Sequence, residues 1–442
     1  MGKSMDRLIV VTEFESSWLD NKRKLYIYLP PSYRHNKDRR YPVLYMHDGQ
    51  HVFQADAAGA SWEMHQTADR LALEGKIEEI IVVGIAIAPH QRLNEYFHDG
   101  PGIRQVFDPP FSGELYEQCV IQEIIPYINE NFRTLTGPEH TAMMGSSAGG
   151  IVTYNIGFRN PQIFGKIAVL SPYFVHTVFE EGTLKEQPFY QRYDSHPNLK
   201  VWMDMGDAEG LFMPKYASEE AVALIRDGFV PDDDLMLLIH HGAGHSQKDW
   251  AARVHAPLLY FFGTLGQTET AVIYGDEVIG IQGPDAILYP VVHYDSGFMH
   301  TPMTGEYTVK HPELLDVLPD GTLKAKAPGV TTIIFEYNGV KAHKKITIVE
   351  KVQEYVKVSI RVDVPDDTPS YRSIYAGIEL LRAGEYTYEG SAQIPRGLTF
   401  TFKIARGFGQ HEKNKDGSPM RSRSFTALKN LDLYYCVQAW ED

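Results

Sequence analysis

The strongest constraint on the fold is an alternation, over residues 25–262, of short β-prone apolar runs with amphipathic helical stretches. This alternation is typical of an α/β layer built on a largely parallel sheet. Several of the runs are apolar throughout, as strands covered by helices on both faces must be. The predicted strands are residues 24–29, 43–47, 80–85, 141–145, 166–170, 201–205 and 235–240, and the predicted helices are 62–73, 114–132, 148–158, 218–227 and 247–261.

The second predicted helix carries apolar side chains at three- and four-residue steps, which predict one buried stripe. Pro126 lies inside it and is expected to kink the helix or to disturb its first half. The stripe is expected to consist of Leu115, Cys119, Ile121, Ile125, Ile128 and Phe132.

The sequence changes character after position 262, where helical periodicity stops and short β-prone runs alternate with turn residues. Residues 321–326 and 329–335 read as strand, turn and strand, and residues 356–362 alternate strictly between polar and apolar. The 442 residues are also enough for about three domains. We therefore expect an α/β domain over 1–265 and two all-β sandwich modules over 266–350 and 351–442.

Charge, hydropathy and cysteine content exclude nucleic acid as a partner, membrane spans, and cysteine-based frameworks or zinc sites. The net charge of −15 repels nucleic acid. No apolar run in the sequence approaches the length of a membrane span, which is roughly 20 residues. Cys119 and Cys436 are too few for a disulfide framework or a cysteine-based zinc site, and we expect both to be reduced core residues.

The N-terminus has no apolar signal segment, which favours a location in the cytoplasm. A signal peptide that had already been removed from a secreted protein would leave no trace.

A nucleophile motif follows the predicted strand 141–145. Residues 145–150 read Gly-Ser-Ser-Ala-Gly-Gly and match G-x-S-x-G between a strand and a helix, the context that this motif requires. A nucleophilic serine at the apex of such a turn needs small neighbours, which Gly145 and Gly149 supply. The pattern predicts Ser147 as the nucleophile.

The general base is expected in the loop after the last predicted strand. His245 lies there between Gly244 and Ser246, at the edge of the sheet where α/β proteins bind ligands. His240 and His241 are the alternatives, but they lie on or just beyond the strand. We therefore select His245.

The acid that orients this histidine is expected after strand 201–205, where three carboxylates compete. Asp204 lies within the strand and is expected to serve packing or a turn hydrogen bond. Glu209 and Asp207 both lie on the following loop; Glu209 is preferred for its longer side chain, and Asp207 remains the alternative. The order Ser147, acid, His245 along the chain is that of α/β-hydrolases.

Two backbone N–H groups are expected to bind the oxyanion of the tetrahedral intermediate. One is that of Ala148, the residue after the nucleophile. The other lies after the early strand 43–47 and is assigned to Gln50, with Gly49 as the alternative. The side chains of the preceding His47 and Asp48 are expected to be structural.

Taken together, these motifs resemble the "Putative esterase" family of α/β-hydrolases, over residues 8–262. The resemblance lies in residues 41–50 (YPVLYMHDGQ), 92–96 (RLNEY), 145–150, 206–209 and 244–245. That family is similar to esterase D, to enterochelin esterases and to the feruloyl and acetylxylan esterases of carbohydrate esterase family 1. The resemblance implies a Ser-acid-His ester hydrolase with no metal and no cofactor, and it implies Glu209 as the acid, where many members carry Asp.

The remaining chain resembles two β modules. Residues 268–350 look like a bacterial immunoglobulin-like module, and the tail resembles starch-binding-type β-sandwiches, whose aromatic side chains stack on sugars. Phe408 and Gly409 stand where such modules often have a tryptophan. The aromatic side chains left as candidates for stacking are Tyr371, Tyr375, Tyr386, Tyr388 and Trp440.

These observations predict a serine carboxylesterase that acts on a small-molecule or glycan-linked ester, of short-acyl or aromatic (feruloyl or acetyl) type. The candidates for its substrate pocket are Arg92, Tyr96, Trp62, Tyr173 and Phe174. The alternative is a catalytically weak hydrolase fold that binds a glycan or a partner. The β modules are expected either to form a homodimer or to cover the catalytic mouth.

Overall fold

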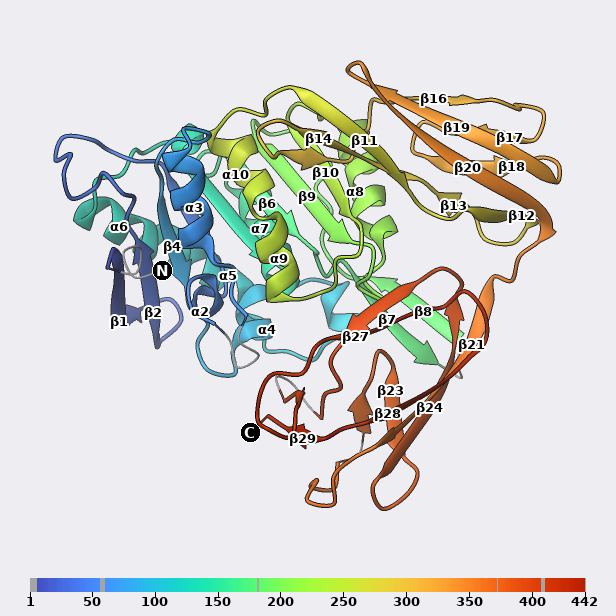
Figure 1. The fold of residues 1–442 in the computed structure, drawn as a ribbon. Coiled ribbons are helices and arrows are strands. Elements are labelled where there is room, and N and C mark those ends of the chain that lie inside the picture. The colour runs from blue at the N-terminus through green and yellow to red at the C-terminus, as the bar shows by residue number, and fades with distance from the viewer. Residues whose placement is uncertain (1–5, 56–59, 181–182, 372, 407–409, 442) are drawn as a thin grey trace.

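An eight-stranded sheet forms the centre of the α/β part of the chain, with strand order β1-β2-β4-β3-β5-β6-β9-β10 (Figure 1). Strands β1 and β2 pair antiparallel, as do β2 and β4, and the remaining neighbours pair parallel. The strands are β1 (Leu8–Ser16), β2 (Asn21–Tyr28), β3 (Val43–Met46), β4 (Ile81–Ile85), β5 (Thr141–Ser146), β6 (Lys166–Leu170), β9 (Lys200–Gly206) and β10 (Leu235–His240). The structure is a computed structural model, and it describes residues 6–55, 60–180, 183–371, 373–406 and 410–441.

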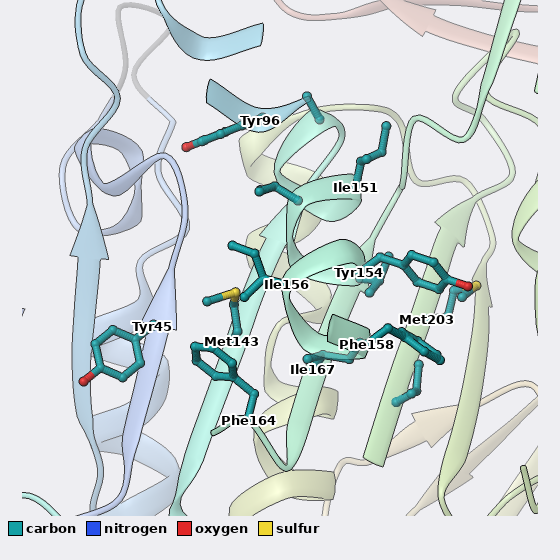
Figure 2. Close-up of a cluster of buried hydrophobic side chains, with 14 of the residues drawn as sticks. Tyr45, Tyr96, Met143, Ile151, Tyr154, Ile156, Phe158, Phe164, Ile167 and Met203 are labelled. Carbon is teal, nitrogen blue, oxygen red and sulfur yellow. The ribbon is translucent and has the colours of Figure 1, made fainter. Parts of the chain in front are cut away.

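Helices cover both faces of this sheet, as the apolar strands predict. One face packs an apolar cluster against α7. In Figure 2 the α7 side chains Tyr154 and Phe158 extend toward Met203, and Ile156 lies beside Met143. A second cluster packs on the other face beneath α3, α9 and α10. The helices are α2 (Gly49–Val52), α3 (Met64–Leu73), α4 (Arg92–Tyr96), α5 (Gly113–Gln118), α6 (Ile125–Asn131), α7 (Ala148–Arg159), α8 (Pro214–Arg226), α9 (Gln247–Arg253) and α10 (His255–Phe262), with short helices at Ile103–Gln105 and Pro138–His140. The α/β-hydrolase arrangement is confirmed.

All seven predicted strands are present, but sequence analysis missed β1 and the hairpin of β7 (Val175–Glu180) and β8 (Thr183–Pro188). Most residues of these strands are exposed or only half-buried. The hairpin strands β7 and β8 carry no continuous apolar run, which is why the search for apolar runs did not find them. Strand β1 does begin with four apolar residues, 8–11, and sequence analysis overlooked them.

The predicted helix 114–132 is present but interrupted. Its middle, Cys119–Ile124, is a π-helical turn that ends where α6 begins, with Pro126 in the first turn of α6. A π turn rotates the helix face, so the predicted stripe is partly wrong: Leu115 is exposed, and Val120 and Ile124 are fully buried.

Every described element after α10 is a strand. The first group lies against the sheet edge at β10, where Thr301 N donates to Leu237 O and Thr301 Oγ1 accepts from Ile239 N. This contact covers the open edge of the sheet. The strands of this group are β11 (Thr268–Tyr274), β12 (Val278–Gln282), β13 (Ala286–Ile287), β14 (Tyr289–Tyr294), β15 (Met299–His300), β16 (Glu306–Val309), β17 (Leu315–Val317), β18 (Thr322–Ala325), β19 (Gly329–Tyr337) and β20 (Val340–Lys351).

The final group of strands has an apolar cluster of its own. Its members are β21 (Tyr355–Asp363), β22 (Ser373–Tyr375), β23 (Glu379–Arg382), β24 (Thr387–Pro395), β25 (Thr399–Phe402), β26 (Glu412–Lys413), β27 (Arg423–Thr426), β28 (Leu431–Cys436) and β29 (Ala439–Trp440). We call residues 355–441 the C-terminal module. In Figure 1 its orange and red strands lie beside the β7–β8 hairpin, and β24 contacts β8.

Three expectations for this module need correction or fall outside the structure. Tyr388 and Trp440 are buried in the core of the module, so they offer no ring to a sugar. Cys436 is exposed rather than a core residue, whereas Cys119 is buried as expected. Phe408 and Gly409 lie outside the described residues.

Among the described helices, none is both long and apolar enough to cross a membrane.

Candidate active site

Four neighbouring parallel strands deliver the candidate site residues to one edge of the sheet. Ser147 follows β5, Ser171 follows β6, Glu209 lies on the loop after β9, and His245 lies on the loop after β10. The carboxyl ends of parallel strands meet at the same edge, which is where α/β sheets bind ligands. The strand order therefore brings together segments that are far apart in the sequence.

Ser147 occupies a strained turn. Its φ is 59° and its ψ is −124°. A non-glycine residue rarely adopts such a conformation, and the strain persists where the surroundings enforce it. The turn is held by a hydrogen bond from Ser147 N to Leu170 O (3.0 Å). A Cβ atom on Gly145 would lie 2.4 Å from the Gly149 carbonyl oxygen, so only glycine fits there. Ser147 is partly exposed, and its hydroxyl forms no hydrogen bond with the residues that the structure describes.

Glu209 is the carboxylate that contacts the candidate base. Its Oε2 lies 2.7 Å from His245 Nδ1, and its side chain is fully buried. Asp207, the alternative acid, instead lies 2.7 Å from His241 Nδ1 and accepts from Gly242 N. With the proton on Nδ1 donated to Glu209, His245 Nε2 has a free lone pair to accept a proton.

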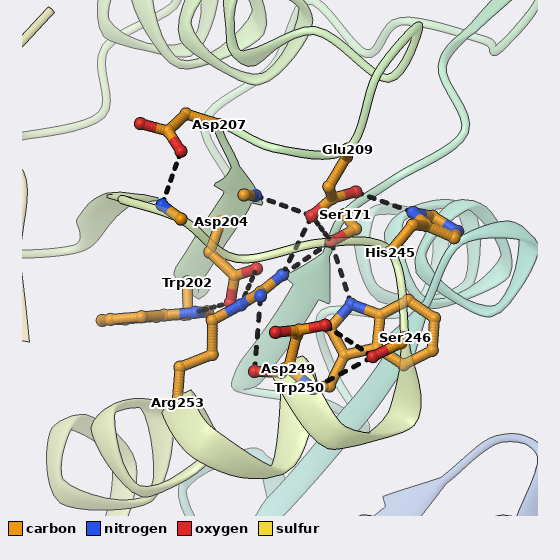
Figure 3. A network of polar contacts seen from close by, with 12 residues as sticks. Ser171, Trp202, Asp204, Asp207, Glu209, His245, Ser246, Asp249, Trp250 and Arg253 are labelled. Carbon is orange, nitrogen blue, oxygen red and sulfur yellow. Dashed lines mark hydrogen bonds and ion pairs between the residues drawn. The ribbon is translucent and has the colours of Figure 1, made fainter. Parts of the chain in front are cut away.

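The other oxygen of Glu209 is held by three donors (Figure 3). Glu209 Oε1 accepts from Ser171 Oγ (2.6 Å), from Gly206 N (2.6 Å) and from Arg253 Nη2 (3.3 Å). Burial alone would raise the pKa of Glu209, but the hydrogen bond and charge of His245 and the charge of Arg253 hold that pKa below its ordinary value. The carboxylate is therefore ionised at neutral pH and fixed in orientation.

Arg253 joins this carboxylate to the second buried acid of the region. It is fully buried, and its Nε donates to Asp204 Oδ1 (2.9 Å), while Asp204 Oδ2 accepts from Trp202 Nε1 (2.8 Å). Burial raises the pKa of Asp204 although Arg253 opposes that rise. Asp204 thus contacts no histidine among the described residues and serves the packing network, as its place within the strand predicted.

Sequence analysis missed three residues of this network: Ser171, Trp250 and Arg253. Ser171 Oγ accepts from Trp250 Nε1 (2.9 Å) and from Arg253 Nη2 (2.6 Å) while it donates to Glu209. Trp250 also packs edge-on against His245, with ring centroids 5.0 Å apart, and Phe212 stacks on His245 at 4.3 Å. The available signal was an arginine one helical turn after a tryptophan in the predicted helix 247–261, and it did not identify the partners of either residue.

The predicted oxyanion donors lie in the first turns of the helices that follow β3 and β5: Gln50 in α2 and Ala148 at the start of α7. Within the described part of the chain, the backbone N–H groups of Gln50 and Ala148 have no hydrogen-bond acceptor. The loop after β3 turns inward through Asp48 (φ 52°), and a Cβ atom on Gly49 would lie 2.4 Å from the backbone of Gly84 in β4. Two free donors at the same sheet edge are what a developing oxyanion requires.

Two residues predicted to line the pocket, Arg92 and Tyr96, instead hold Asp48, which precedes the candidate oxyanion donor Gln50. Arg92 forms a bidentate ion pair with Asp48 (2.8 and 2.7 Å), and Tyr96, which is fully buried, accepts from Asp48 N (2.9 Å). Burial would raise the pKa of Asp48, but Arg92 keeps it below its ordinary value. His47 Nδ1 lies 2.8 Å from Tyr116 Oη, and burial lowers the pKa of His47 to about 3. His47 and Asp48 thus each have a structural partner.

Only one of the five predicted pocket residues lines the pocket beside His245. Tyr173 does so, in a pocket of about 430 Å³. Trp62 is buried and stacks on Trp250 at 5.7 Å, and Phe174 is fully buried and stacks on Tyr190 at 4.0 Å. Tyr96, Trp62 and Phe174 are therefore corrected to packing residues, because aromatic patterning does not distinguish a core ring from a pocket ring. Arg92 is corrected to the ion-pair partner of Asp48.

The histidines near β10 have separate partners, since His241 contacts Asp207 and His245 contacts Glu209. Among the described residues, no group of three or more His, Cys, Asp or Glu side chains is placed to hold a metal ion.

Comparison with known proteins places residues 16–258 in the family described as "Putative esterase". The chain is 26% identical to the "Uncharacterized protein YbbA" of Bacillus subtilis over 254 residues, which cover 54% of this chain and 93% of that protein. It is 32% identical to an "Endo-1,4-beta-xylanase/feruloyl esterase" of Xylanibacter ruminicola over 231 residues, which cover 51% of this chain but only 27% of that protein.

Two similar solved structures are esterases. One is a ferulic acid esterase of Anaeromyces mucronatus (18% identity, TM-score 0.42, covering 57% of this chain and 89% of that one). The other is the enterobactin esterase FES of Shigella flexneri (16% identity, TM-score 0.44, covering 57% of this chain and 59% of that one). Because the family model matches more than half of the chain, this protein belongs to the putative esterase family and is an esterase.

Proposed function

We propose that this protein is a serine carboxylesterase that works through an acyl-enzyme on Ser147, with His245 as the base and Glu209 as the acid. The observation that carries the proposal is the 2.7 Å contact between Glu209 Oε2 and His245 Nδ1, at the sheet edge that also holds the strained Ser147. This contact sets the histidine tautomer that a serine nucleophile needs.

In the first half of the reaction, Ser147 Oγ attacks the ester carbonyl carbon as its proton moves to His245 Nε2. The resulting imidazolium is stabilised by the ionised, buried Glu209. His245 then gives the proton to the departing alkoxide, the bond from the carbonyl carbon to the alcohol oxygen breaks, and an acyl-serine remains.

In the second half, water replaces the alcohol. It loses a proton to His245 Nε2 and attacks the acyl carbon, and the proton returns to Ser147 Oγ as the carboxylic acid leaves. In both halves the oxyanion is bound by the N–H groups of Ala148 and Gln50, each of which is worth about 3 kcal/mol of the barrier.

The substrates that we propose are short-acyl or aromatic esters of the feruloyl or acetyl type. A ring-lined pocket beside His245 supports this, since Tyr173 and Phe212 line it. The name of the Xylanibacter relative includes feruloyl esterase activity. Cinnamoyl-type acyl groups are flat and apolar, and such rings bind favourably between aromatic side chains.

We further propose three structural units, over residues 1–265, 266–350 and 351–442, with the second of immunoglobulin-like type and the third of starch-binding type. The separate apolar cluster of the last unit supports the second boundary. The first boundary is supported by the change from helices to strands after α10.

Hydrolysis of p-nitrophenyl acetate tests the proposed function. Ser147→Ala is expected to lower kcat by at least about 1000-fold, because the nucleophile and the acyl-enzyme are both lost. Ser146→Ala changes the neighbouring serine, which is buried, and serves as the matched control. Equal activity in wild type and Ser147→Ala would refute the proposal. Absence of turnover in the wild type, together with retention on insoluble polysaccharide, would favour the glycan-binding alternative.

A further inference from the structure

A strand of the C-terminal module lies directly along the loop that carries Glu209. Gly210 N donates to Thr399 O (3.0 Å), and Thr401 N donates to Ala208 O (3.0 Å), so that Glu209 and Phe400 face each other as an antiparallel pair. The module therefore extends the acid loop as a two-stranded ladder. Backbone hydrogen bonds of this kind fix position and register at once.

The pocket beside His245 lies between the two parts of the chain. The catalytic domain contributes Tyr173, Thr177, Phe212 and His245 among others, and the C-terminal module contributes Tyr375, Gly377, residues 400–403, Ala405 and His411. A group bound in this pocket is next to the base. It is also in contact with the C-terminal module, which forms about half of the lining.

The wall that the C-terminal module contributes to the pocket is closely packed and aromatic. Phe400 is buried and stacks on Phe425 with centroids 4.8 Å apart, and Phe402 packs edge-on against the same ring. A Cβ atom on Gly210 would lie 2.7 Å from the Phe400 ring, so the acid loop approaches this ring as closely as a glycine allows. A fixed wall of this type selects among ligands by shape because it does not rearrange.

Among the described charged groups of the pocket, Lys403 stands without a partner. Glu209 is satisfied by His245 and Arg253, and His411 contacts Glu441 at 3.4 Å. Lys403 is half-buried at the pocket wall and forms no hydrogen bond or ion pair with any residue in the described ranges. An ammonium group in this setting has three donors to offer to a ligand, and carboxylates are its usual partners.

We propose that the C-terminal module completes the ester-binding site, and that Lys403 selects esters that carry a carboxylate remote from the scissile carbonyl. The proposal rests on the proposed esterase activity and names the substrate class of the same site. The net charge of −15 repels anions from the protein as a whole, so an anionic ester needs such a local cation in order to bind.

Matched pairs of esters test the role of Lys403. Mono-p-nitrophenyl esters of dicarboxylic acids of increasing length are compared with the same esters capped by a methyl group, with the rate in Ser147→Ala subtracted as background. We expect the wild type to prefer the free carboxylate in kcat/KM by about fivefold at one or more lengths, which corresponds to about 1 kcal/mol. Lys403→Gln is expected to remove the preference, Lys403→Arg to retain it and Lys403→Glu to reverse it.

Lys429→Gln is the control, since Lys429 is an exposed lysine of the same module and does not line the pocket. It is expected to keep the wild-type preference. The proposal is overturned if the wild type shows no preference at any length, or if Lys403→Gln lowers kcat/KM equally for free and capped esters. Turnover of p-nitrophenyl acetate that depends on Ser147 would then still support the proposed function, so the two failures are distinguishable.

Tyr375→Ala tests the wall itself, because Tyr375 lines the pocket, is 45% exposed and is not one of the buried core residues of the module. It is expected to lower kcat/KM for the long carboxylated esters at least about threefold more than for the acetate, mainly through KM, since binding contacts of the distal group are lost. An equal effect on long and short esters would show that the module does not contact the substrate.

Discussion

Replacing Glu209 by Gln changes one atom of the carboxylate that faces His245. Glu209 Oε1 would still accept from Ser171 and Gly206 N as an amide oxygen. The other atom becomes an NH₂ group, which can only donate. His245 Nδ1 must then accept, so the ring proton moves to Nε2, and the base has no lone pair for the serine proton.

The size of the effect follows from the geometry, in which Glu209 Oε2 lies 2.7 Å from His245 Nδ1. At an effective dielectric constant of about 20, an imidazolium and a carboxylate at this separation attract each other by about 6 kcal/mol. This figure is an upper value, because both charges are spread over several atoms and the His245 side chain is 23% exposed. About 1.36 kcal/mol corresponds to a factor of ten in rate, so we expect Glu209→Gln to lower kcat by about 1000- to 10,000-fold.

The measurement is kcat for p-nitrophenyl acetate at neutral pH, together with thermal unfolding to establish that the variant is folded at the assay temperature. Asp207→Asn is the matched control, since it removes the carboxylate that contacts His241 and leaves the contact of Glu209 intact. We expect less than about a threefold change in the control. The reasoning is refuted if Asp207→Asn loses as much activity as Glu209→Gln, or if Glu209→Gln retains more than about a tenth of the wild-type rate.

Three further predictions concern the supports of the site. Gly49→Ala places a Cβ atom 2.4 Å from the Gly84 backbone in β4, whereas a Cβ atom on Gly100 meets open space. Gly49→Ala is therefore expected to lower kcat and to cost about 1–3 kcal/mol of unfolding free energy, and Gly100→Ala is expected to be neutral in both measurements. His47 stays neutral in the folded protein to about pH 3 but binds a proton below its ordinary pKa of 6.5 when unfolded, so it makes stability fall with decreasing pH. Urea unfolding of His47→Gln between pH 4 and 6 should show a slope that is smaller by up to about 1.4 kcal/mol per pH unit, and an unchanged slope would contradict the burial of a neutral ring. Arg253→Met leaves buried carboxylates uncompensated and is expected to cost about 3–5 kcal/mol in urea unfolding. The additional change Asp204→Asn should recover part of that loss, and a loss below about 1 kcal/mol would show that the ion pair is not structural.

Local signals predicted the central sheet and its catalytic loops. The apolar runs of β6 and β10 give the observed strand bounds, because each of these strands is apolar and buried without interruption except for one polar residue at one end. Ser147 was predicted from the small residues around it, and one of these, Gly145, is required by the backbone of Gly149 only four positions away. Glu209 was preferred over Asp207 for its longer side chain, the family resemblance strengthened that choice, and the structure brings Glu209 to His245.

The site residues that sequence analysis missed or misplaced depend on contacts between segments that are distant in the sequence. Ser171 and Arg253 are 82 positions apart, and neither has a neighbour in the sequence that reveals the other. Tyr96 and Phe174 were expected in the pocket because they are aromatic residues near the motifs, but both are buried, and ring size predicts burial as readily as exposure. The contact between Phe400 and the acid loop lies beyond any local pattern, because it depends on how two independently packed units meet.

Labelling with a fluorophosphonate tests most directly whether Ser147 is an activated nucleophile. The reagent phosphonylates an activated serine and displaces fluoride, and the adduct is located by mass spectrometry of the peptides. Our account predicts a single adduct on Ser147 in the wild type and in Ser146→Ala, and strongly reduced labelling in His245→Gln. An adduct on a different serine, or undiminished labelling of Ser147→Ala, would contradict it.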